Sequence, residues 1–181
     1  LEALRSTGRD WMLNLNFFSG GSKILGKVES DCSPALQFIS QQEALATTCD
    51  GQGGRMVVAV STEGRRMWEE SSPSTQVWPV LVMAPDGLRL ARVTLTVDHP
   101  VNAFSPLSFD DVKGQLVEVY DAADGKLVLK ASASPVLDGG GNVAISPSGK
   151  RVAVLDAGAI QVYELPEPEP KAKADAGHSA R

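Results

Sequence analysis

The strongest constraint on how this chain folds is the stretch 142–165, NVAISPSGKRVAVLDAGAIQVYEL. Apolar residues alternate with other residues over 143–145 and again over 152–154, the spacing that places side chains on one face of a strand. Between these runs, the tetrapeptide SPSG has proline where a tight turn presets φ and glycine where the turn needs positive φ. A second break, DAG at 156–158, leads into a third apolar alternation. The stretch therefore predicts three consecutive antiparallel strands with no room for a helix.

Parts of this unit recur upstream. Residues 77–95, VWPVLVMAPDGLRLARVTL, repeat the first hairpin, and residues 35–49, ALQFISQQEALATTC, repeat it with a degenerate turn. A short turn and a fourth apolar run follow the first three copies of the third strand. These third-strand copies start 45, 60 and 44 residues apart, at Trp11, Met56, Leu116 and Ile160. Four strands in each period of about 40 to 50 residues is typical of a β-propeller blade.

Two of these hairpins resemble those of a known family. SPSGKRVAVLDAG and APDGLRLARVTL resemble the Ser-Pro-Asp-Gly-Lys hairpin of bacterial YVTN-type and WD-repeat-like β-propellers, and VEVYDAADGKLV resembles the strand that follows it. The resemblance covers residues 11–165 and implies an all-β chain of four-stranded antiparallel blades. Where a WD repeat has Trp-Asp, this chain has pairs such as Tyr120-Asp121, which favours the YVTN-like type. Propellers of this kind include lyases, quinoprotein dehydrogenases and plain binding platforms, so the resemblance implies a fold and leaves the activity open.

The number of strand patterns predicts an incomplete propeller of about three blades. Residues 11–28 supply only the last two strands of a blade, two complete blades follow, and the final one lacks its outermost strand, with breaks near 29–34, 70–76 and 131–141. Residues 1–10 have too little apolar content to assign. Residues 166–181 are rich in Pro, Glu, Lys and Ala and are expected to be disordered. We therefore expect the C-terminal portion of a longer propeller, whose open sheet edges invite self-association.

Composition and charge argue against two classes of partner. With 181 residues, 43% of them hydrophobic and 22% charged, the chain has the composition of an ordinary globular protein. A formal net charge of -5 and the lack of clustered Lys and Arg argue against nucleic acid and against an anionic membrane surface. No apolar run is long enough for a transmembrane helix, and no signal peptide is present in this chain.

The two cysteines are predicted to form a disulfide. If the turn at Gln41 and Gln42 pairs Phe38 with Leu45, residue 34 faces Cys49, and Cys32 lies one pair beyond it, within bridging reach. The alternative is two unrelated thiols. A single bridge favours an oxidising compartment, so we expect a periplasmic or extracellular location. Metal binding by the pair would need additional Cys or His ligands nearby, and the sequence has none there.

The spacing of 60 residues indicates an insertion at 96–114, TVDHPVNAFSPLSFDDVKG. Long loops in compact domains tend to be functional or disordered. Adjacent carboxylates on an extended segment point to opposite sides, so Asp110 and Asp111 make a poor acid/base pair, and a structural or solvated role is the alternative for the whole loop. Strand order places the insertion on the same rim as 31–34, 71–76 and 135–141. The candidate binding residues are His99, Phe104, Phe109, Asp110 and Asp111.

Two functions follow from these patterns. The first is a non-catalytic binding or scaffold propeller that presents loops on one rim to a protein or small ligand. The second is a fragment of a propeller enzyme, similar to a lyase or quinoprotein dehydrogenase, whose active site lies partly in missing blades. No nucleophile with a base, no metal-ligand cluster and no cofactor motif can be assembled from the sequence, which favours binding and predicts no cofactor. Trp68 and Trp78 are expected to pack between neighbouring blades.

Overall fold

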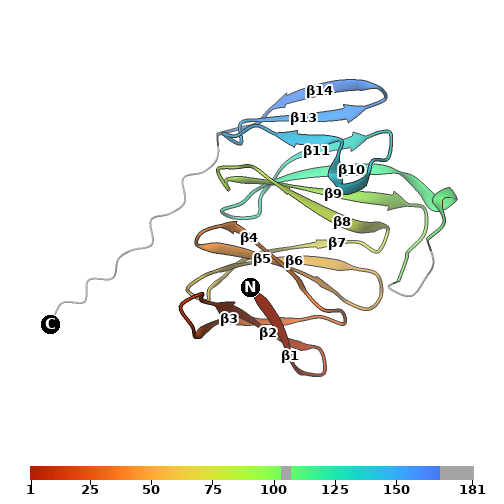
Figure 1. The fold of residues 1–181 in the computed structure, drawn as a ribbon. Helices are drawn as coiled ribbons and strands as arrows, with labels where there is room; N and C mark the ends of the chain where they lie inside the picture. The colour runs from red at the N-terminus through yellow and green to blue at the C-terminus, as the bar shows by residue number, and fades with distance from the viewer. Residues whose placement is uncertain (103–106, 168–181) are drawn as a thin grey trace.

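The computed structural model describes residues 1–102 and 107–167, so Phe104 and residues 168–181 of the predicted disordered tail lie outside the described residues. The described part is all-β. Its strands form four antiparallel sheets of three or four strands each, and these sheets lie one above another in chain order (Figure 1). Within every sheet, strands that follow one another in the sequence are also neighbours in space.

The strands have the following bounds. The first sheet contains β1 (Glu2–Thr7), β2 (Asp10–Asn16) and β3 (Ser22–Glu29). The second sheet contains β4 (Ala35–Ser40), β5 (Glu43–Cys49), β6 (Arg55–Ser61) and β7 (Arg66–Ser72). The third sheet contains β8 (Gln76–Met83), β9 (Arg89–Val97), β10 (Val112–Asp121) and β11 (Leu127–Ala133). The fourth sheet contains β12 (Val143–Ile145), β13 (Arg151–Asp156) and β14 (Ala159–Glu164), and two short 3-10 helices, η1 (Phe109–Asp111) and η2 (Asp138–Gly140), lie in connections.

The first sheet corrects one prediction. The sequence pattern predicts only two strands in residues 11–28 and leaves 1–10 unassigned, but β1 pairs with β2, with Ala3 opposite Leu13. Leu1 and Ala3 pack against the core, whereas most side chains of β1 are exposed. An edge strand of this kind has a weak apolar alternation, so its sequence gives little indication of a strand.

The predicted hairpin turns are confirmed. The Gly149 N–H donates to the Ser146 carbonyl oxygen at 2.9 Å, and the Gly87 N–H donates to the Ala84 carbonyl oxygen at 2.9 Å. Both glycines have positive φ, 64° and 71°, which a residue with a side chain rarely adopts. These two turns set the registers of β12 with β13 and of β8 with β9.

Most of the hydrophobic core lies in the three interfaces between consecutive sheets. A smaller cluster of Val77, Val97 and Val101 lies where β8 and β9 meet the connection that follows β9. Leu45 of β5 and Val57 of β6 pack towards the third sheet. Their neighbours Ala46 and Val58 pack towards the first sheet. Because successive side chains of a strand point to opposite faces, a strand between two other sheets buries both sets. This explains why the β6 sequence, MVVAV, is an almost continuous apolar run.

The two tryptophans of the second and third sheets differ from each other. Trp68 is buried, and its indole N–H donates to the Ala122 carbonyl oxygen at 2.9 Å, so packing between sheets is confirmed for this residue. Trp78 is 59% exposed and has a φ of 50°, so the same prediction is wrong there. The pairing of β8 with β9 shifts between Val77 and Val80, and this irregularity turns Trp78 away from the interface.

A buried ionic cluster lies within the third sheet. Glu118 accepts from Arg92 Nη2 at 2.8 Å and from Lys130 Nζ at 3.1 Å, and the Arg92 guanidinium lies 5.1 Å from the centre of the Tyr120 ring. Burial alone would raise the pKa of Glu118, but the hydrogen bonds from Arg92 and Lys130 outweigh it and leave the pKa below its ordinary value. Burial raises the pKa of Tyr120. The carboxylate of Glu118 is thus held charged inside the fold.

The beginning of the predicted disordered tail contacts the fold. Arg89, which is fully buried, pairs with Asp121 at 2.9 Å and also donates to the Pro166 carbonyl oxygen at 2.7 Å. Lys150 pairs with Glu167 at 2.7 Å. Residues 166 and 167 are therefore ordered against the third and fourth sheets, which corrects the predicted start of the tail.

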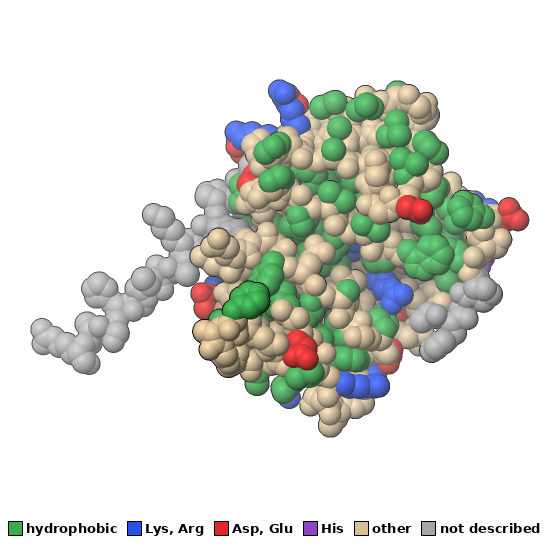
Figure 2. All heavy atoms as spheres, in the orientation of Figure 1, with side chains coloured by type: hydrophobic (Ala, Val, Ile, Leu, Met, Phe, Trp, Pro, Cys, Tyr) green, Lys and Arg blue, Asp and Glu red, His purple; other side chains and the backbone are tan. Residues whose placement is uncertain are grey.

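The outer face of the fourth sheet is apolar apart from the exposed ion pair of Arg151 with Glu164. Register places Ala153 opposite Val162 and Leu155 opposite Ile160, so their side chains share that face. Ile160 is 73% exposed and Val162 is 63% exposed. In Figure 2, hydrophobic side chains gather over this upper end of the molecule. Within the residues that the structure describes, no helix is long and apolar enough to cross a membrane.

Candidate functional site

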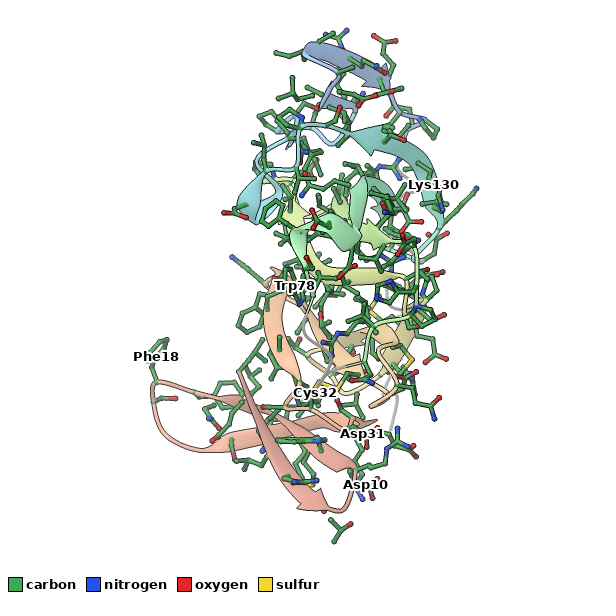
Figure 3. All side chains as sticks on the ribbon, turned by 90° about the vertical axis from the view of Figure 1, so that its right-hand side faces the viewer. Asp10, Phe18, Asp31, Cys32, Trp78 and Lys130 are labelled. Atoms are coloured by element: carbon green, nitrogen blue, oxygen red, sulfur yellow. A yellow bond between two sulfur atoms is a disulfide. The ribbon has the colours of Figure 1, made fainter. Side chains whose placement is uncertain are left out.

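The disulfide is present and lies where the first and second sheets meet. Cys32 and Cys49 are bonded, with their Cα atoms 5.7 Å apart, and Cys32 is labelled in Figure 3. The predicted bridge is confirmed, but the register differs by one residue. Gln37, and not Phe38, lies opposite Leu45, because the pairing of β4 with β5 shifts between Phe38 and Ser40. A bonded cysteine pair fits an extracellular location.

The predicted insertion is shorter than the sequence indicates, because the strands extend into it. Val97 of β9 pairs with Val112 of β10, so the connection spans 98–111. The first half of the connection contacts the segment between β7 and β8 and the turn that follows β5. The Val101 N–H donates to the Ser74 carbonyl oxygen at 3.0 Å, and a Cβ at Gly53 would collide with the Val101 carbonyl oxygen. The part of the connection around Val101 therefore lies against the 50–54 turn.

The end of this connection is closed by a capped turn and an ion pair. The Ser108 N–H donates to the Asp111 carboxylate at 2.8 Å, and the Asp110 N–H donates to Ser108 Oγ at 3.3 Å, which together form a capping box. Asp98 pairs with Lys113 at 2.9 Å and hydrogen-bonds His99 Nδ1 at 2.7 Å. These two interactions lower the pKa of Asp98 to about 2, and the hydrogen bond from Lys113 has the larger effect.

The structure brings some of the predicted binding residues together and separates others. One possible ligand atom from each of Asp98, His99 and Asp111 lies within 4.8 Å of the others, which the sequence analysis did not foresee because the two ends of the connection meet only in the fold. Such groups suit a divalent cation, but the Lys113 ammonium already neutralises Asp98. Phe109 is 86% exposed and takes no part in the cluster.

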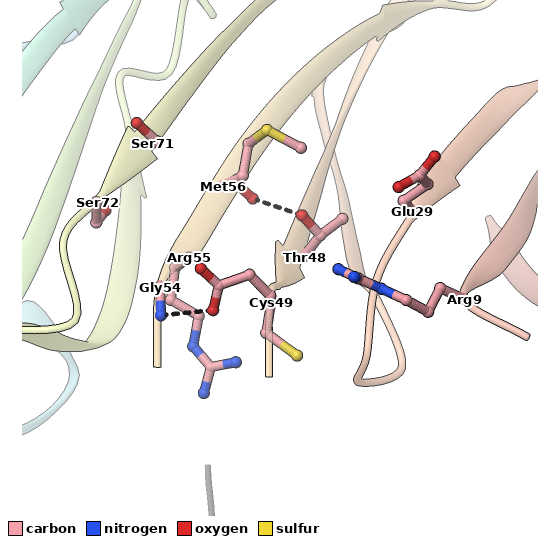
Figure 4. A pocket seen from close by; sticks show the side chains of 10 residues that line it. Arg9, Glu29, Thr48, Cys49, Gly54, Arg55, Met56, Ser71 and Ser72 are labelled. Carbon is pink, nitrogen blue, oxygen red and sulfur yellow. Dashed lines mark hydrogen bonds between the residues drawn. The ribbon is translucent and has the colours of Figure 1, made fainter. Parts of the chain in front are cut away.

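A pocket that the sequence analysis missed opens beside this connection. Its volume is about 230 Å³, and it lies at the ends of β3, β5, β6 and β7 (Figure 4). Arg9 reaches into it from the turn between β1 and β2, whereas Arg55 lies on its other side, at the start of β6. The polar side chains that line it include Arg9, Glu29, Asp50, Arg55, Ser71 and Ser72. No periodic signal marks these residues, because they come from the ends of several strands and from two turns.

The two arginines of the pocket differ in their partners. Arg9 Nε lies 3.0 Å from the Asp31 carboxylate. Arg55 Nη1 donates to Cys32 Sγ at 3.6 Å, and across residues 1–102 and 107–167 the guanidinium has no carboxylate partner. The disulfide thus holds Arg55 in place with a weak sulfur acceptor and leaves most of its donors free for a ligand.

Hydroxyl and carboxylate groups complete the lining. Ser72 is only 4% exposed, and its Oγ has no hydrogen-bond partner within the described part of the chain. It lies directly opposite Arg55, which in turn lies opposite Cys49. One oxygen of Asp50 accepts from the N–H groups of Gln52 and Gly54, both at 2.9 Å. The pocket therefore contains hydrogen-bond donors of both charged and neutral type beside two carboxylates.

The pocket and the connection share one rim. The 50–54 turn lines the pocket with Asp50 and Gly54, while its Gly53 touches Val101. On the opposite side of this turn, Gly51 lies against the Asp31 side chain. Ligand contacts in the pocket and at the connection can therefore belong to one binding surface, which we call the rim site (the pocket and residues 98–101 and 107–111).

Comparison with known proteins gives the fold only. No family model matches the chain, and no curated protein matches it. The crystal structure of the uncharacterized protein lmo1340 from Listeria monocytogenes EGD-e is similar, with a TM-score of 0.50 and 11% sequence identity, over 88% of this chain and 48% of that protein. The chain thus spans about half the length of that protein.

Proposed function

We propose that this chain is a non-catalytic binding module, built as part of a β-propeller, which holds its ligand at the rim site. Four stacked antiparallel sheets with sequential strand order support the propeller assignment, as do the confirmed Ser-Pro-Ser-Gly and Ala-Pro-Asp-Gly turns. The bonded cysteine pair supports a periplasmic or extracellular location.

The observation that carries the binding function is the pocket of about 230 Å³, which polar residues from several strand ends and two turns line. Arg55 belongs to this lining, and a guanidinium that donates only to a sulfur atom makes weak use of its donors. A ligand with acceptor oxygens would use these donors. A concave pocket with a few polar groups is the usual form of a small-ligand site.

The connection 98–111 supplies the second part of the proposed rim site. The capping box fixes 108–111, and the Asp98–Lys113 pair links the two ends of the connection, so that Phe109 is presented to solvent at 86% exposure. An exposed aromatic side chain on an ordered turn is suited to anchor a partner. His99, Asp110 and Asp111 would surround such a contact with polar groups.

The experiment that tests this function is a screen of small molecules against the isotope-labelled chain by amide NMR. We expect hits whose shift changes cluster at the pocket, on the amides of Thr48, Arg55 and Ser72. Ser71→Phe, on an exposed strand position of the lining, should fill the pocket and abolish these changes. Glu69→Phe, two residues away on the same face of β7, should leave them intact. Hits that scatter over the surface, or survive Ser71→Phe, would contradict the proposal.

A further inference from the structure

We infer that two copies of this chain pair through the free edges of their β14 strands, antiparallel and about a twofold axis, so that their fourth sheets form one continuous sheet. This edge lies outside the rim site and is independent of the ligand proposed there. Three features of β14 support the pairing: the lack of edge protection, the direction of its backbone groups and its sequence.

The edge of β14 lacks the protection that the other sheet edges have. In the described part of the chain, each of the edge strands β1, β3, β4, β7, β8 and β11 has a pairing that shifts at one point, and β12 has only three residues. Bulges, short length and charged side chains usually keep an edge strand from pairing with another chain. The pairing of β14 with β13 shows no shift, and the only charged residue of β14 is the last, Glu164.

Nothing in the described residues covers this strand. Residues 159–162 are all exposed, and β14 is the last strand of its sheet. In Figure 1 it lies at the outermost end of the stack of sheets. A strand from a second copy can therefore approach the edge.

The backbone of β14 turns hydrogen-bonding groups towards the open edge. The Leu165 N–H donates to the Lys150 carbonyl oxygen at 2.9 Å. In an antiparallel pair, residues that exchange hydrogen bonds alternate with residues that do not. Leu165 and every second residue before it, including Gln161, therefore bond to β13, whereas the N–H and carbonyl groups of Ile160 and Val162 point to the open edge.

The sequence of β14 matches itself in one register. A twofold axis through Gln161 places Ile160 opposite Val162 of the second copy. Both residues direct their backbone groups to the edge, so they exchange two hydrogen bonds, and the symmetry-related pair does the same. Apolar side chains then lie opposite apolar side chains, which stabilises a cross-strand pair. An axis through Val162 would instead place Ile160 opposite Glu164, an apolar side chain opposite a carboxylate.

The charges of β14 also suit pairing with a second copy. In the register centred on Gln161, Glu164 lies opposite Gly158, so the two carboxylates do not face each other. Each carboxylate is already paired with Arg151 of its own chain at 3.0 Å. Because like charges directly opposite each other destabilise a strand pair, this separation favours a second copy as the partner of the edge.

The first test is disulfide crosslinking of the intact chain with one added thiol. The two native cysteines are bonded to each other, so Gln161→Cys supplies the only free thiol. On the twofold axis, the Cα atoms of the two introduced cysteines lie about 4.5 Å apart, which is within bridging range. We expect a covalent dimer under mild oxidation.

Ala159→Cys is the matched control for this crosslink. Ala159 is exposed and lies two residues from Gln161, on the same face of β14. In the proposed register, the Cα atoms of the two cysteines at 159 are about 14 Å apart, so this variant should crosslink at least about tenfold more slowly.

A second pair of variants distinguishes edge pairing from packing of sheet faces. Val162→Pro removes an N–H at the open edge without removing a bond to β13, whereas Val162→Ala keeps that N–H and also shortens the side chain. Val162→Pro should weaken dimerisation at least about tenfold relative to Val162→Ala, because half of the hydrogen bonds between the copies are lost. Light scattering over a range of concentrations measures this, and amide NMR spectra show whether both variants are folded.

Three results would overturn the inference. The first is a wild-type chain that stays monomeric at all concentrations, with no covalent dimer of Gln161→Cys. The second is equal crosslinking of Gln161→Cys and Ala159→Cys, which contradicts the register. The third is equal dimerisation of Val162→Pro and Val162→Ala, which would place the contact on the outer face of the fourth sheet and not at the edge of β14.

Discussion

Arg55 and Ser72 lie directly opposite each other at the rim ends of β6 and β7, and neither finds a carboxylate or amide partner there among the residues described. Ser72→Ala should therefore leave the free energy of unfolding unchanged or raise it by up to about 1 kcal/mol, because it removes an unsatisfied buried hydroxyl. Urea unfolding measures this.

Ser30→Ala is the matched control for that prediction. Ser30 is fully buried, and its Oγ accepts from the Cys49 N–H at 3.0 Å. Its removal leaves a buried donor without a partner and should destabilise the chain by about 1–3 kcal/mol. If Ser72→Ala and Ser30→Ala lower the free energy of unfolding equally, Ser72 Oγ must have a hydrogen-bond partner.

The disulfide should stabilise the fold mainly through the unfolded state. Cys32 and Cys49 are separated by 17 residues, and closing a loop of this length contributes about 3 kcal/mol in the chain-entropy model. The double variant Cys32→Ser/Cys49→Ser should lose about this amount in urea unfolding, and a reductant should lower wild-type stability while leaving the variant unaffected. Two free thiols in the native oxidised protein would refute the bridge.

The Glu118 cluster should make stability depend on pH. Because the pKa of Glu118 is lowered in the fold, its contribution is present above the ordinary value of 4.5 and is lost as pH falls through the lower folded value. Glu118→Gln leaves Arg92 buried without its counter-charge and should destabilise the chain by about 3–5 kcal/mol near neutral pH. Unfolding free energies measured across the acidic range should fall less steeply for this variant. Lys130→Met, at the exposed end of the cluster, should have an effect of about 1 kcal/mol or less.

The Asp98–Lys113 pair can be tested by titration. The pKa of Asp98 is lowered to about 2, chiefly by the hydrogen bond from Lys113 and next by that from His99. Lys113→Gln should therefore raise it towards the ordinary value of 3.8, as followed by the carbon-13 shift of the carboxyl group. Lys126→Gln, a lysine outside this cluster, should leave it unchanged. The Asp98–Lys113 pair stabilises the fold above about pH 3.8, the ordinary pKa of the carboxyl group. This stabilisation is lost as the pH falls through about 2.

The outer face of the fourth sheet should drive self-association. Ile160 and Val162 are adjacent apolar residues of this face, 73% and 63% exposed, and sheet faces of this kind bury themselves where they can. Light scattering should show a mass that rises with concentration, and Ile160→Lys/Val162→Lys should suppress the rise. Phe18→Lys, at an exposed turn of the first sheet, is the control. A monomer at all concentrations would contradict this expectation.

Much of the fold follows from local patterns. Alternation in 143–145 and 152–154, the two glycine turns and the near-continuous run of β6 each act over a few neighbouring residues, so the sequence alone determines most of the strands after β1, their order and their hairpins. The cysteine pair follows as well, because its two residues flank one hairpin. The bulge before Ser40 shifts the register by one residue without removing the bridge.

The tertiary structure decided what depends on residues that are distant in sequence. β1 is a strand because β2 offers it an edge, and Trp78 is exposed because β8 is irregular against β9. The rim site exists only where four strand ends and the 98–111 connection meet, so its arginines carry no pattern in the sequence. Alternation and turns arise from the geometry of a few consecutive residues, whereas a pocket arises from the packing of separate sheets, which no local pattern specifies.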